Sequence, residues 1–423
     1  MSALLRWIMP RLGRFSPPSP LVFSNTNFER ISASRKVEEE TFPDYLVARY
    51  YPVRIGDVFA SRYQVVGKLG YGAFSTVWLA RDLNAANSKN LHVALKVFIR
   101  SQAMGSQADH ELNMYKHIGS IAASSKHPGR HAVRTMLDSF KIDGPDGEHY
   151  CLVHPPLWDS VKAFLARNPI GRLPPPVLGI VLQRLFLALD FLHTECRLVH
   201  TDIKDDNIMF GIEDESVFTE FERAELETPS PWKEVENGRF IYLSRQLTIP
   251  KISFLGPPVL CDFGSAMSGD TENTKDVQPN VYRSPEVLLN IPWSYEIDIW
   301  NAGCLVWDIF EGRHMFSGKD PEHQAYRSRA HLASIISLLG PPPTTLLDRG
   351  ELSSKFFSDD GIFNAGIEIP PGRSLEDIET TLEGSEDREQ FMQLMRKMVQ
   401  WLPERRSTAK ELLSDPWLKA QAR

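Results

Sequence analysis

Polar side chains of three kinds stand close together in the stretch HTDIKDDN, residues 200–207. Asp202 offers a carboxylate that could accept the proton of a hydroxyl, and Lys204 offers a cation that could neutralise a moving phosphoryl group. Asn207 offers an amide oxygen of the kind that Mg²⁺ takes as a ligand. Asp262, in the later stretch CDFGSA, offers a second hard oxygen ligand. Together these residue types suit metal-assisted transfer of a phosphoryl group to a hydroxyl.

A glycine-containing stretch earlier in the chain could grip phosphates. KLGYGAFSTVWLA places Gly70 and Gly72 between two β-rich runs, where backbone amides can approach a phosphate because no Cβ intrudes. A strand rather than a helix follows, which excludes the dinucleotide-binding fingerprint. Taken alone, the stretch fits a hairpin with a flexible turn better than a phosphate-binding loop.

The stretch VALK adds a cation on a later strand. The ammonium of Lys96 could pair with nucleotide phosphates if a carboxylate holds it, and Glu111 in DHELNMYKHI is the expected partner. Lys96 alone would be read as a surface lysine. Its position between the glycines and Glu111 favours the functional interpretation.

Two regions with different residue patterns must position these groups. From Arg62 to about Val97, short β-rich runs separated by turns predict an antiparallel sheet, and a helix is expected near 107–118. After the prolines at 174–176, apolar residues recur at helical spacing. We therefore expect an α+β fold with a β-rich N-terminal lobe at about 62–155 and a helical C-terminal lobe at about 160–418.

An acid-rich, weakly periodic stretch at about 211–255 is expected to be an insertion between the groups at 200–207 and Asp262. One interpretation is a solvated, disordered loop. The other is that the acids of 213–236 attract basic peptides.

Composition narrows the classes of protein. The chain has 423 residues, 42% of them hydrophobic and 24% charged, as in soluble globular proteins. A net charge of -7 gives no basic field for direct nucleic-acid binding. We find no run of about eighteen apolar residues and expect no membrane span. Four scattered cysteines predict free thiols in a reducing compartment.

The first 45 residues are expected to be a disordered or targeting segment. They carry Arg6, Arg11 and Arg14, several serines and no acid before Glu29, as a mitochondrial presequence would, but prolines interrupt the helix. An intracellular location in the cytoplasm or nucleus is expected, with the mitochondrion as the alternative.

The order of these features resembles that of eukaryotic protein kinases, over about 62–418. YRSPEVL with Glu286, DIWNAGC with Asp298, and Arg406 as the buried partner of Glu286 fit the same resemblance, which implies that Asp298 holds the loop at 200–207 by its backbone. It implies a bilobal protein-kinase fold that uses ATP and Mg²⁺. The implied catalytic residues are Asp202 and Lys204, and the implied metal ligands are Asn207 and Asp262. The implied ATP-binding residues are Leu69, Gly70, Gly72, Ser75, Val77, Ala94, Lys96, Glu111, Pro155 and Leu157.

Several details are similar to the SR-protein kinase family of the CMGC group, and the chain resembles a divergent, fungal-like member with a short spacer. The details are HTDIK, NVYRSPEVLL with Arg283, SIISLLGPPP, and the 60 residues that separate Asp202 from Asp262. Two departures are Asp205-Asp206, where the family has Pro-Glu, and the hinge HPPL, which would put His154 at the gatekeeper position.

Thr201 stands where most regulated kinases have an arginine that binds a phosphorylated activation segment. Threonine cannot make that grip, so the resemblance implies a constitutively competent serine/threonine kinase rather than an inactive one. Protein substrates are expected, Arg/Ser-rich splicing factors among them, with the kinase acting as a monomer. The alternatives are a CMGC kinase of other specificity and a pseudokinase scaffold.

Overall fold

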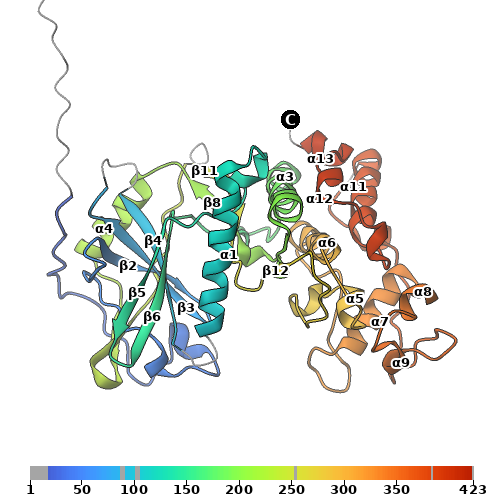
Figure 1. Ribbon diagram of the computed structural model, residues 1–423, viewed down its shortest axis with the longest axis horizontal. Helices are drawn as coiled ribbons and strands as arrows, with labels where there is room; N and C mark the ends of the chain where they lie inside the picture. The colour runs from blue at the N-terminus through green and yellow to red at the C-terminus, as the bar shows by residue number, and fades with distance from the viewer. Residues whose placement is uncertain (1–17, 86–90, 101–104, 252–254, 383, 422–423) are drawn as a thin grey trace, which may run out of the picture. The chain divides into compact units, whose positions relative to one another are not determined.

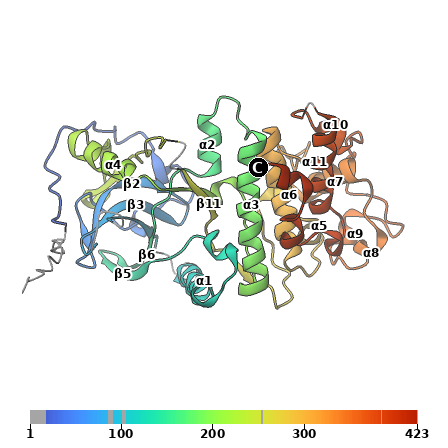
Figure 2. The ribbon, with the colours of Figure 1, turned by 90° about the horizontal axis from the view of Figure 1, so that it is seen from above.

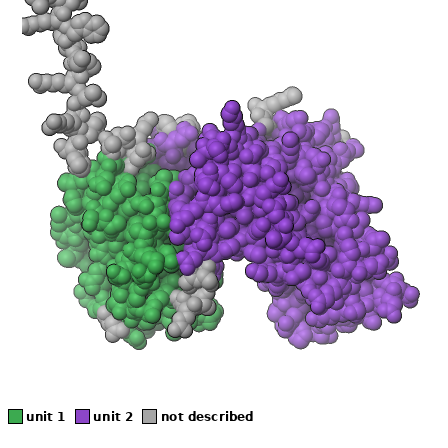
Figure 3. Space-filling view, in the orientation of Figure 1, with its two compact units in different colours: residues 1–101, 137–156, 215–249 green, residues 102–136, 157–214, 250–423 purple. Residues whose placement is uncertain are grey.

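The computed structural model describes residues 18–85, 91–100, 105–251, 255–382 and 384–421 (Figure 1). The arginines on which the targeting interpretation depends lie outside the described residues. The chain forms two compact units (Figure 3). Residues 1–101, 137–156 and 215–249 make the β-rich unit, and residues 102–136, 157–214 and 250–423 make the helical unit.

The β-rich unit is built on a six-stranded antiparallel sheet of order β1-β2-β3-β4-β6-β5. Its elements are β1 (Val58–Phe59), β2 (Tyr63–Tyr71), β3 (Ser75–Asp82), β4 (His92–Phe98), β5 (Asp138–Gly144), β6 (Gly147–His154), α4 (Ser216–Glu227), β9 (Trp232–Val235) and β10 (Arg239–Tyr242). The predicted antiparallel sheet is therefore confirmed.

The two faces of this sheet carry different residues. Residues directly opposite each other on neighbouring strands point to the same face. Val77 pairs with Lys96, which fixes one face, and Trp78 pairs with Leu95, which fixes the other. The second face, here called the Trp78 face, holds the hydrophobic core of the unit, in which Val65, Trp78, Ala80, Val93, Leu95, Val97 and Val153 pack together.

A cover of two distant segments packs on the Trp78 face. We define the cover as residues 18–55 together with the insertion residues 215–249. Tyr242 of β10 joins the core cluster, and Val53 enters it from the N-terminal side. Trp232 on β9 stacks on Phe28 with 4.4 Å between ring centroids, and Arg239 donates to Tyr50 O at 2.6 Å.

The insertion thus differs from the solvated, disordered loop that its composition suggested, while the attraction of basic peptides by its acids stays a prediction. Its helix α4 buries Val217, Phe218 and Phe221, whose spacing forms one apolar face. Several of its acids are used internally: Glu222 contacts His92 at 3.1 Å, and Glu225 is buried beside Arg245. Residues 18–45 likewise contain ordered structure, including the short helix η1 (Glu38–Thr41), instead of the expected disorder.

The helical unit contains α1 (Gly105–Ser124), α2 (Val161–Arg167), α3 (Pro175–Phe191), β7 (Leu198–Val199), β8 (Ile208–Ile212), β11 (Leu255–Leu260), β12 (Met267–Ser268), α5 (Pro285–Leu288), α6 (Glu296–Glu311), α7 (Ser328–Leu339), α8 (Thr344–Leu347), α9 (Ser353–Phe356), α10 (Leu375–Ile378), α11 (Ser385–Met398), α12 (Ala409–Leu412) and α13 (Pro416–Gln421). The long helices predicted after the prolines at 174–176 are present. The compact units do not follow the predicted lobes in chain order, because α1 belongs to the helical unit and the insertion to the β-rich unit.

Helices α3 and α6 form the centre of the helical unit, where they lie side by side (Figure 2). Two prolines open α3, and Leu178, Val181, Leu182 and Leu185 then face inward without exposure above 2%. By length and composition Pro175–Cys196 could cross a membrane, a possibility that the sequence reading missed. Most of the segment is buried within the protein, as expected for the core helix of a soluble domain.

Gly129 sets how closely the loop after α1 approaches α3. A Cβ built on Gly129 would lie 1.9 Å from the carbonyl oxygen of Leu187, a backbone atom that cannot move aside. We expect Gly129→Ala to lower the free energy of unfolding by about 1–3 kcal/mol, measured by urea titration with circular dichroism. The matched control is Gly119→Ala on α1, where nothing lies within 4 Å and a gain of about 0.5–1 kcal/mol is expected. Equal stability of Gly129→Ala and wild type would contradict this account of the packing.

Candidate active site

One buried carboxylate holds the loop that carries the candidate catalytic residues. Asp298 on α6 has no exposed surface, and its Oδ2 accepts from His200 N at 2.7 Å and its Oδ1 from Thr201 N at 2.9 Å. His193 Nε2 lies 2.9 Å from Oδ2 as well. The predicted role of Asp298 as the backbone anchor of this loop is confirmed. The anchor holds Thr201 at φ 70, a conformation that β-branched residues rarely adopt.

Asp202 follows the anchored residues and gathers the other polar groups of the loop. Lys204 Nζ lies 2.7 Å from Asp202 Oδ2, and Asn207 donates through its amide nitrogen to Asp202 O at 2.8 Å and Oδ2 at 3.0 Å. Asp202 and Lys204 keep 23% and 33% of their side chains exposed, so both can reach a reacting group. The amide nitrogen of Asn207 is occupied, which orients its oxygen toward another partner.

Asp262 lies two residues after the end of β11, the strand that pairs with β8 just after Asn207. Its φ of 64 is unusual for a non-glycine residue, and such strain is common at functional positions. The carboxylate of Asp262 and the amide oxygen of Asn207 are both hard oxygen donors, the type that Mg²⁺ prefers. The helical unit therefore carries a donor set that fits magnesium.

A series of edge-to-face ring contacts connects α1 to these two loops. Tyr115 on α1 contacts Phe263 edge-on with ring centroids 5.2 Å apart, and Phe263 contacts His200 at 5.4 Å. Glu111 on α1 lies near Gly264, since a Cβ on that glycine would be 3.2 Å from Glu111 Oε2. His110 Nε2 adds a contact of 2.7 Å with Ala266 O. Helix α1 and the Asp262 loop are therefore held together inside one unit.

The β-rich unit brings the predicted phosphate-gripping residues into one row. Gly70 pairs with Val77, Val77 with Lys96, and Lys96 with Leu152. The side chains of Val77, Lys96 and Leu152 therefore point to the face opposite Trp78, and Gly70 lies in the same row. Ala94 is two residues from Lys96 on β4 and shares this face. The remaining predicted residues, Leu69 and Ser75, stand on β2 and at the start of β3. The pairing of Lys96 with Glu111 stays a prediction.

The predicted hinge follows β6. His154 ends that strand opposite Ala94 and has no exposed surface, whereas Pro155 and Leu157 are half-buried. The gatekeeper assignment of His154 and the nucleotide contacts of Pro155 and Leu157 stay predictions. Asp206, in the predicted departure from the family, pairs with Lys162 of α2 at 2.8 Å, and burial raises the pKa of Asp205.

Several functional candidates were missed at the sequence level because their partners are distant in the chain. Asn301 on α6 donates to Ile203 O at 3.1 Å, and Gln278 donates to Asn301 Oδ1 at 3.0 Å and to Ile297 O at 2.8 Å. Glu286 and Arg406 form the buried ion pair that was predicted, with Oε2 2.8 Å from the guanidinium. The contacts of Gln278 and the Glu286–Arg406 pair both hold the segment after Asp262 against the core of the helical unit.

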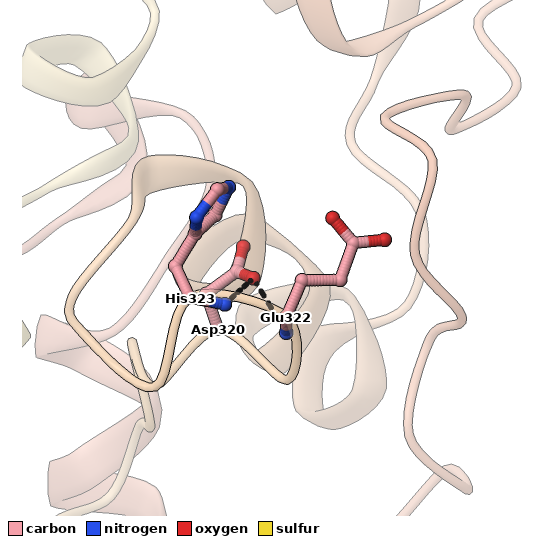
Figure 4. Close-up of side chains that lie close together, drawn as sticks. All are labelled: Asp320, Glu322 and His323. Carbon is pink, nitrogen blue, oxygen red and sulfur yellow. Dashed lines mark hydrogen bonds between the residues drawn. The ribbon is translucent and has the colours of Figure 1, made fainter.

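A separate group of possible metal ligands is better explained as a turn. Asp320, Glu322 and His323 lie within reach of one another (Figure 4). The carboxylate of Asp320 accepts hydrogen bonds from the backbone amides of Glu322 and His323 and from the guanidinium of Arg329. The hydrogen bond from Arg329 lowers the pKa of Asp320. Its oxygens are already occupied, so the cluster is better explained as a hydrogen-bonded turn than as a metal site.

Comparisons with known proteins agree with this geometry. The protein kinase domain family matches residues 63–242 and 256–418. A serine/threonine protein kinase of Aspergillus fumigatus is 42% identical over 416 residues, covering 97% of this chain and 99% of the relative. The serine/threonine-protein kinase SRPK of Physarum polycephalum is 29% identical over 90% of this chain and 91% of its own length. SRSF protein kinase 3 of Homo sapiens is 24% identical over 90% of both. The chain belongs to the protein kinase family, as a serine/threonine kinase similar to the SR-protein kinases.

Proposed function

We propose that this serine/threonine kinase phosphorylates serines flanked by arginines and that it needs no phosphorylation of its own to be active. Asp202 accepts the proton of the substrate hydroxyl, and Lys204, 2.7 Å from it, neutralises the moving phosphoryl group. Asn207 and Asp262 hold Mg²⁺, which neutralises charge on the phosphates of ATP. Lys96, with Gly70 and Val77 in its row, binds the nucleotide from the β-rich unit.

Two observations support a basic substrate. Relatives whose names are SRPK and SRSF protein kinase 3 align with nearly the whole chain. The helical unit also carries a cavity of about 350 Å³ whose charged lining is mainly acidic. Asp270, Glu272, Glu296 and Glu404 face it, against one cation, Arg349, that reaches Glu404 only at 3.4 Å. Carboxylates suit guanidinium groups through charge-assisted hydrogen bonds.

Independence from phosphorylation is supported by how Thr201 is used. Its hydroxyl donates to Ser265 O at 2.8 Å, three residues after Asp262. A neutral hydrogen bond therefore connects the catalytic loop with the metal-binding loop at the position where regulated kinases use an arginine. Gln278 anchors the later part of the same segment to α6 through Ile297 and Asn301.

The first prediction concerns substrate choice and catalysis. Phosphatase-treated protein should transfer radiolabelled phosphate from Mg-ATP to an Arg-Ser repeat peptide with a kcat/KM about tenfold or more above that for a Ser-Pro peptide without arginine. Asp202→Asn should lower kcat by about 10²-fold or more while ATP still binds, because the proton acceptor is lost. A preference for the Ser-Pro peptide would favour a CMGC kinase of other specificity. No transfer by wild type to any protein substrate would favour a scaffold.

The second prediction tests the Thr201 hydroxyl. In Thr201→Val the Ser265 carbonyl loses its donor, and we expect kcat to fall about two- to tenfold, corresponding to about 0.5–1.5 kcal/mol for one hydrogen bond. Thr201→Ser keeps the hydroxyl and is the control, with kcat near that of wild type. Equal kcat values for Thr201→Val and wild type would contradict the proposed link between the two loops.

The third prediction tests constitutive competence directly. Ser265, Ser268, Thr271 and Thr274 are the hydroxyl residues between Asp262 and Asn280. Their joint replacement by Ala should leave kcat for the Arg-Ser peptide within about threefold of wild type, because the contacts of Thr201 and Gln278 with the backbone remain. The measurement uses protein shown to be phosphate-free by mass spectrometry. Loss of activity in that protein would refute independence from activation-segment phosphorylation.

A further inference from the structure

Lys68 is a buried lysine that sits two residues before the first glycine of the phosphate-gripping loop. Its side chain has no exposed surface. The ammonium bonds the carboxylate of Glu39, lies 3.2 Å from Glu38 Oε2, and donates to Tyr242 O at 3.3 Å. Burying an ammonium is costly unless it is paired, so these three partners are required for Lys68 to occupy this position.

Both segments of the cover meet at this lysine. Glu38 and Glu39 belong to η1 in the N-terminal segment, whereas Tyr242 belongs to the insertion. Glu38 is also fixed by Ser244, whose hydroxyl donates to Oε2 at 2.6 Å and whose amide donates to Oε1 at 3.0 Å. The backbone of Lys68 is held as well, because Arg245 N donates to Lys68 O at 2.9 Å. Contacts that start 29 and 174 residues away thus converge on one position of β2.

A β-bulge connects Lys68 to the row that contains Lys96. Lys68 pairs with Trp78 while Gly70 pairs with Val77, the preceding residue on β3, so Leu69 is the extra residue of the bulge. Because Trp78 and Val77 point to opposite faces, Lys68 points into the cover while Gly70 joins the row with Lys96. The position of the glycine loop therefore depends on how Lys68 is held.

The cover touches the same strand on both sides of Lys68. A Cβ on Gly67 would lie 2.7 Å from the ring of Phe221 on α4, so the helix packs directly against the strand there. Tyr71, between the two glycines, contacts Phe42 of the N-terminal segment with ring centroids 5.8 Å apart. Gly70 and Gly72 themselves have no atoms near enough to restrain a Cβ. The loop tip is open, and its anchorage lies at residues 67, 68 and 71.

We propose that Lys68 is a positioning residue for ATP, through which the N-terminal segment and the insertion together hold the glycine loop in its nucleotide-binding conformation. The inference rests on the ATP-dependent activity proposed above and adds a role for two segments outside the catalytic residues. Holding a loop in its bound conformation raises affinity by reducing the ordering cost of binding. Lys68 acts through the backbone of the loop and does not contact the nucleotide.

The test compares two buried lysines of the cover. Lys68→Met removes the ammonium and keeps most of the side-chain volume. Lys233→Met is the matched control, because Lys233 is also buried and also joins the insertion to η1, through Glu40 at 2.7 Å, but it lies on β9 and not on the strand that carries the glycine loop. Both variants should lower the thermal unfolding midpoint, since each leaves a buried or largely buried carboxylate without its cation.

Only the Lys68 variant should weaken nucleotide binding. We expect Lys68→Met to raise the Kd for a fluorescent ATP analogue and the KM for ATP about five- to twentyfold, with kcat at saturating ATP within about threefold of wild type. Lys233→Met should leave both constants within about twofold of wild type. Lys68→Arg keeps the charge and should restore most of the affinity.

The outcomes separate the possible failures. Equal rises in Kd for Lys68→Met and Lys233→Met would overturn the proposal, because the effect would then be general loss of stability. If Lys68→Met does not fold, Glu38→Gln is the milder variant, since Glu38 retains some exposure, and an unchanged Kd there would overturn the proposal. Failure of wild type to phosphorylate the Arg-Ser peptide would refute the proposed substrate, while analogue binding would still report on Lys68.

Discussion

The chemistry of this kinase depends on one buried carboxylate. Asp298 has no exposed surface and accepts hydrogen bonds from two consecutive backbone amides and from His193. Hydrogen bonds to a charged group contribute about 1.5–3 kcal/mol each, enough to hold Thr201 at a φ that costs about 1–3 kcal/mol. The direction of the chain after Thr201, and with it the position of Asp202, follows from this anchor. Without it, the donor and acceptor groups at 202–207 would have no fixed relation to α6.

The two faces of the sheet in the β-rich unit have different roles. The face with Val77 and Lys96 is the one proposed to bind the nucleotide, and a face that binds a ligand cannot also supply the hydrophobic core of the unit. The Trp78 face supplies that core, but it needs a partner layer to exclude water. The N-terminal segment and the insertion form that layer. This division explains why a stretch between the catalytic loop and Asp262 folds with strands that precede it by more than a hundred residues.

The sequence predicted those parts of the site whose residues lie close together in the chain. HTDIKDDN, CDFGSA and VALK each place their chemistry within a few residues of backbone, and the loops at 200–207 and 262–264 depend on that local geometry. The short β-rich runs from Arg62 to about Val97 likewise indicated the sheet, because strand-forming residues and the turns between them are local signals. Asp298 and the Glu286–Arg406 pair were predicted only through family resemblance.

The remainder depends on contacts that no local pattern contains. Lys68 looks like an ordinary strand lysine until Glu39 and Tyr242 are placed around it. The spacing of Val217, Phe218 and Phe221 marks an apolar helix face, and this signal was overlooked because the acids around it dominate the composition. Acidic residues were taken as evidence of solvation, yet Glu222 and Glu225 face basic partners inside the unit. Composition describes what a segment contains, whereas its partners decide whether those charges meet water.

Thr201 joins the catalytic loop to the segment after Asp262 through an uncharged side chain. An arginine at this position would act by binding a phosphorylated residue in the segment after Asp262, so its effect would depend on modification. A threonine in the same place has no charge to balance, and its hydroxyl reaches the Ser265 carbonyl directly. An arginine–phosphate pair is strong but forms only after phosphorylation, whereas the hydrogen bond from Thr201 to Ser265 is weaker and needs no modification. A weak permanent bond suffices only if the rest of the segment is already ordered. The contacts of Gln278 with α6 and the edge-to-face ring contacts of Tyr115, Phe263 and His200 meet that requirement. The constitutive competence proposed for this kinase would therefore rest on several neutral contacts acting together, with Thr201 as one of them.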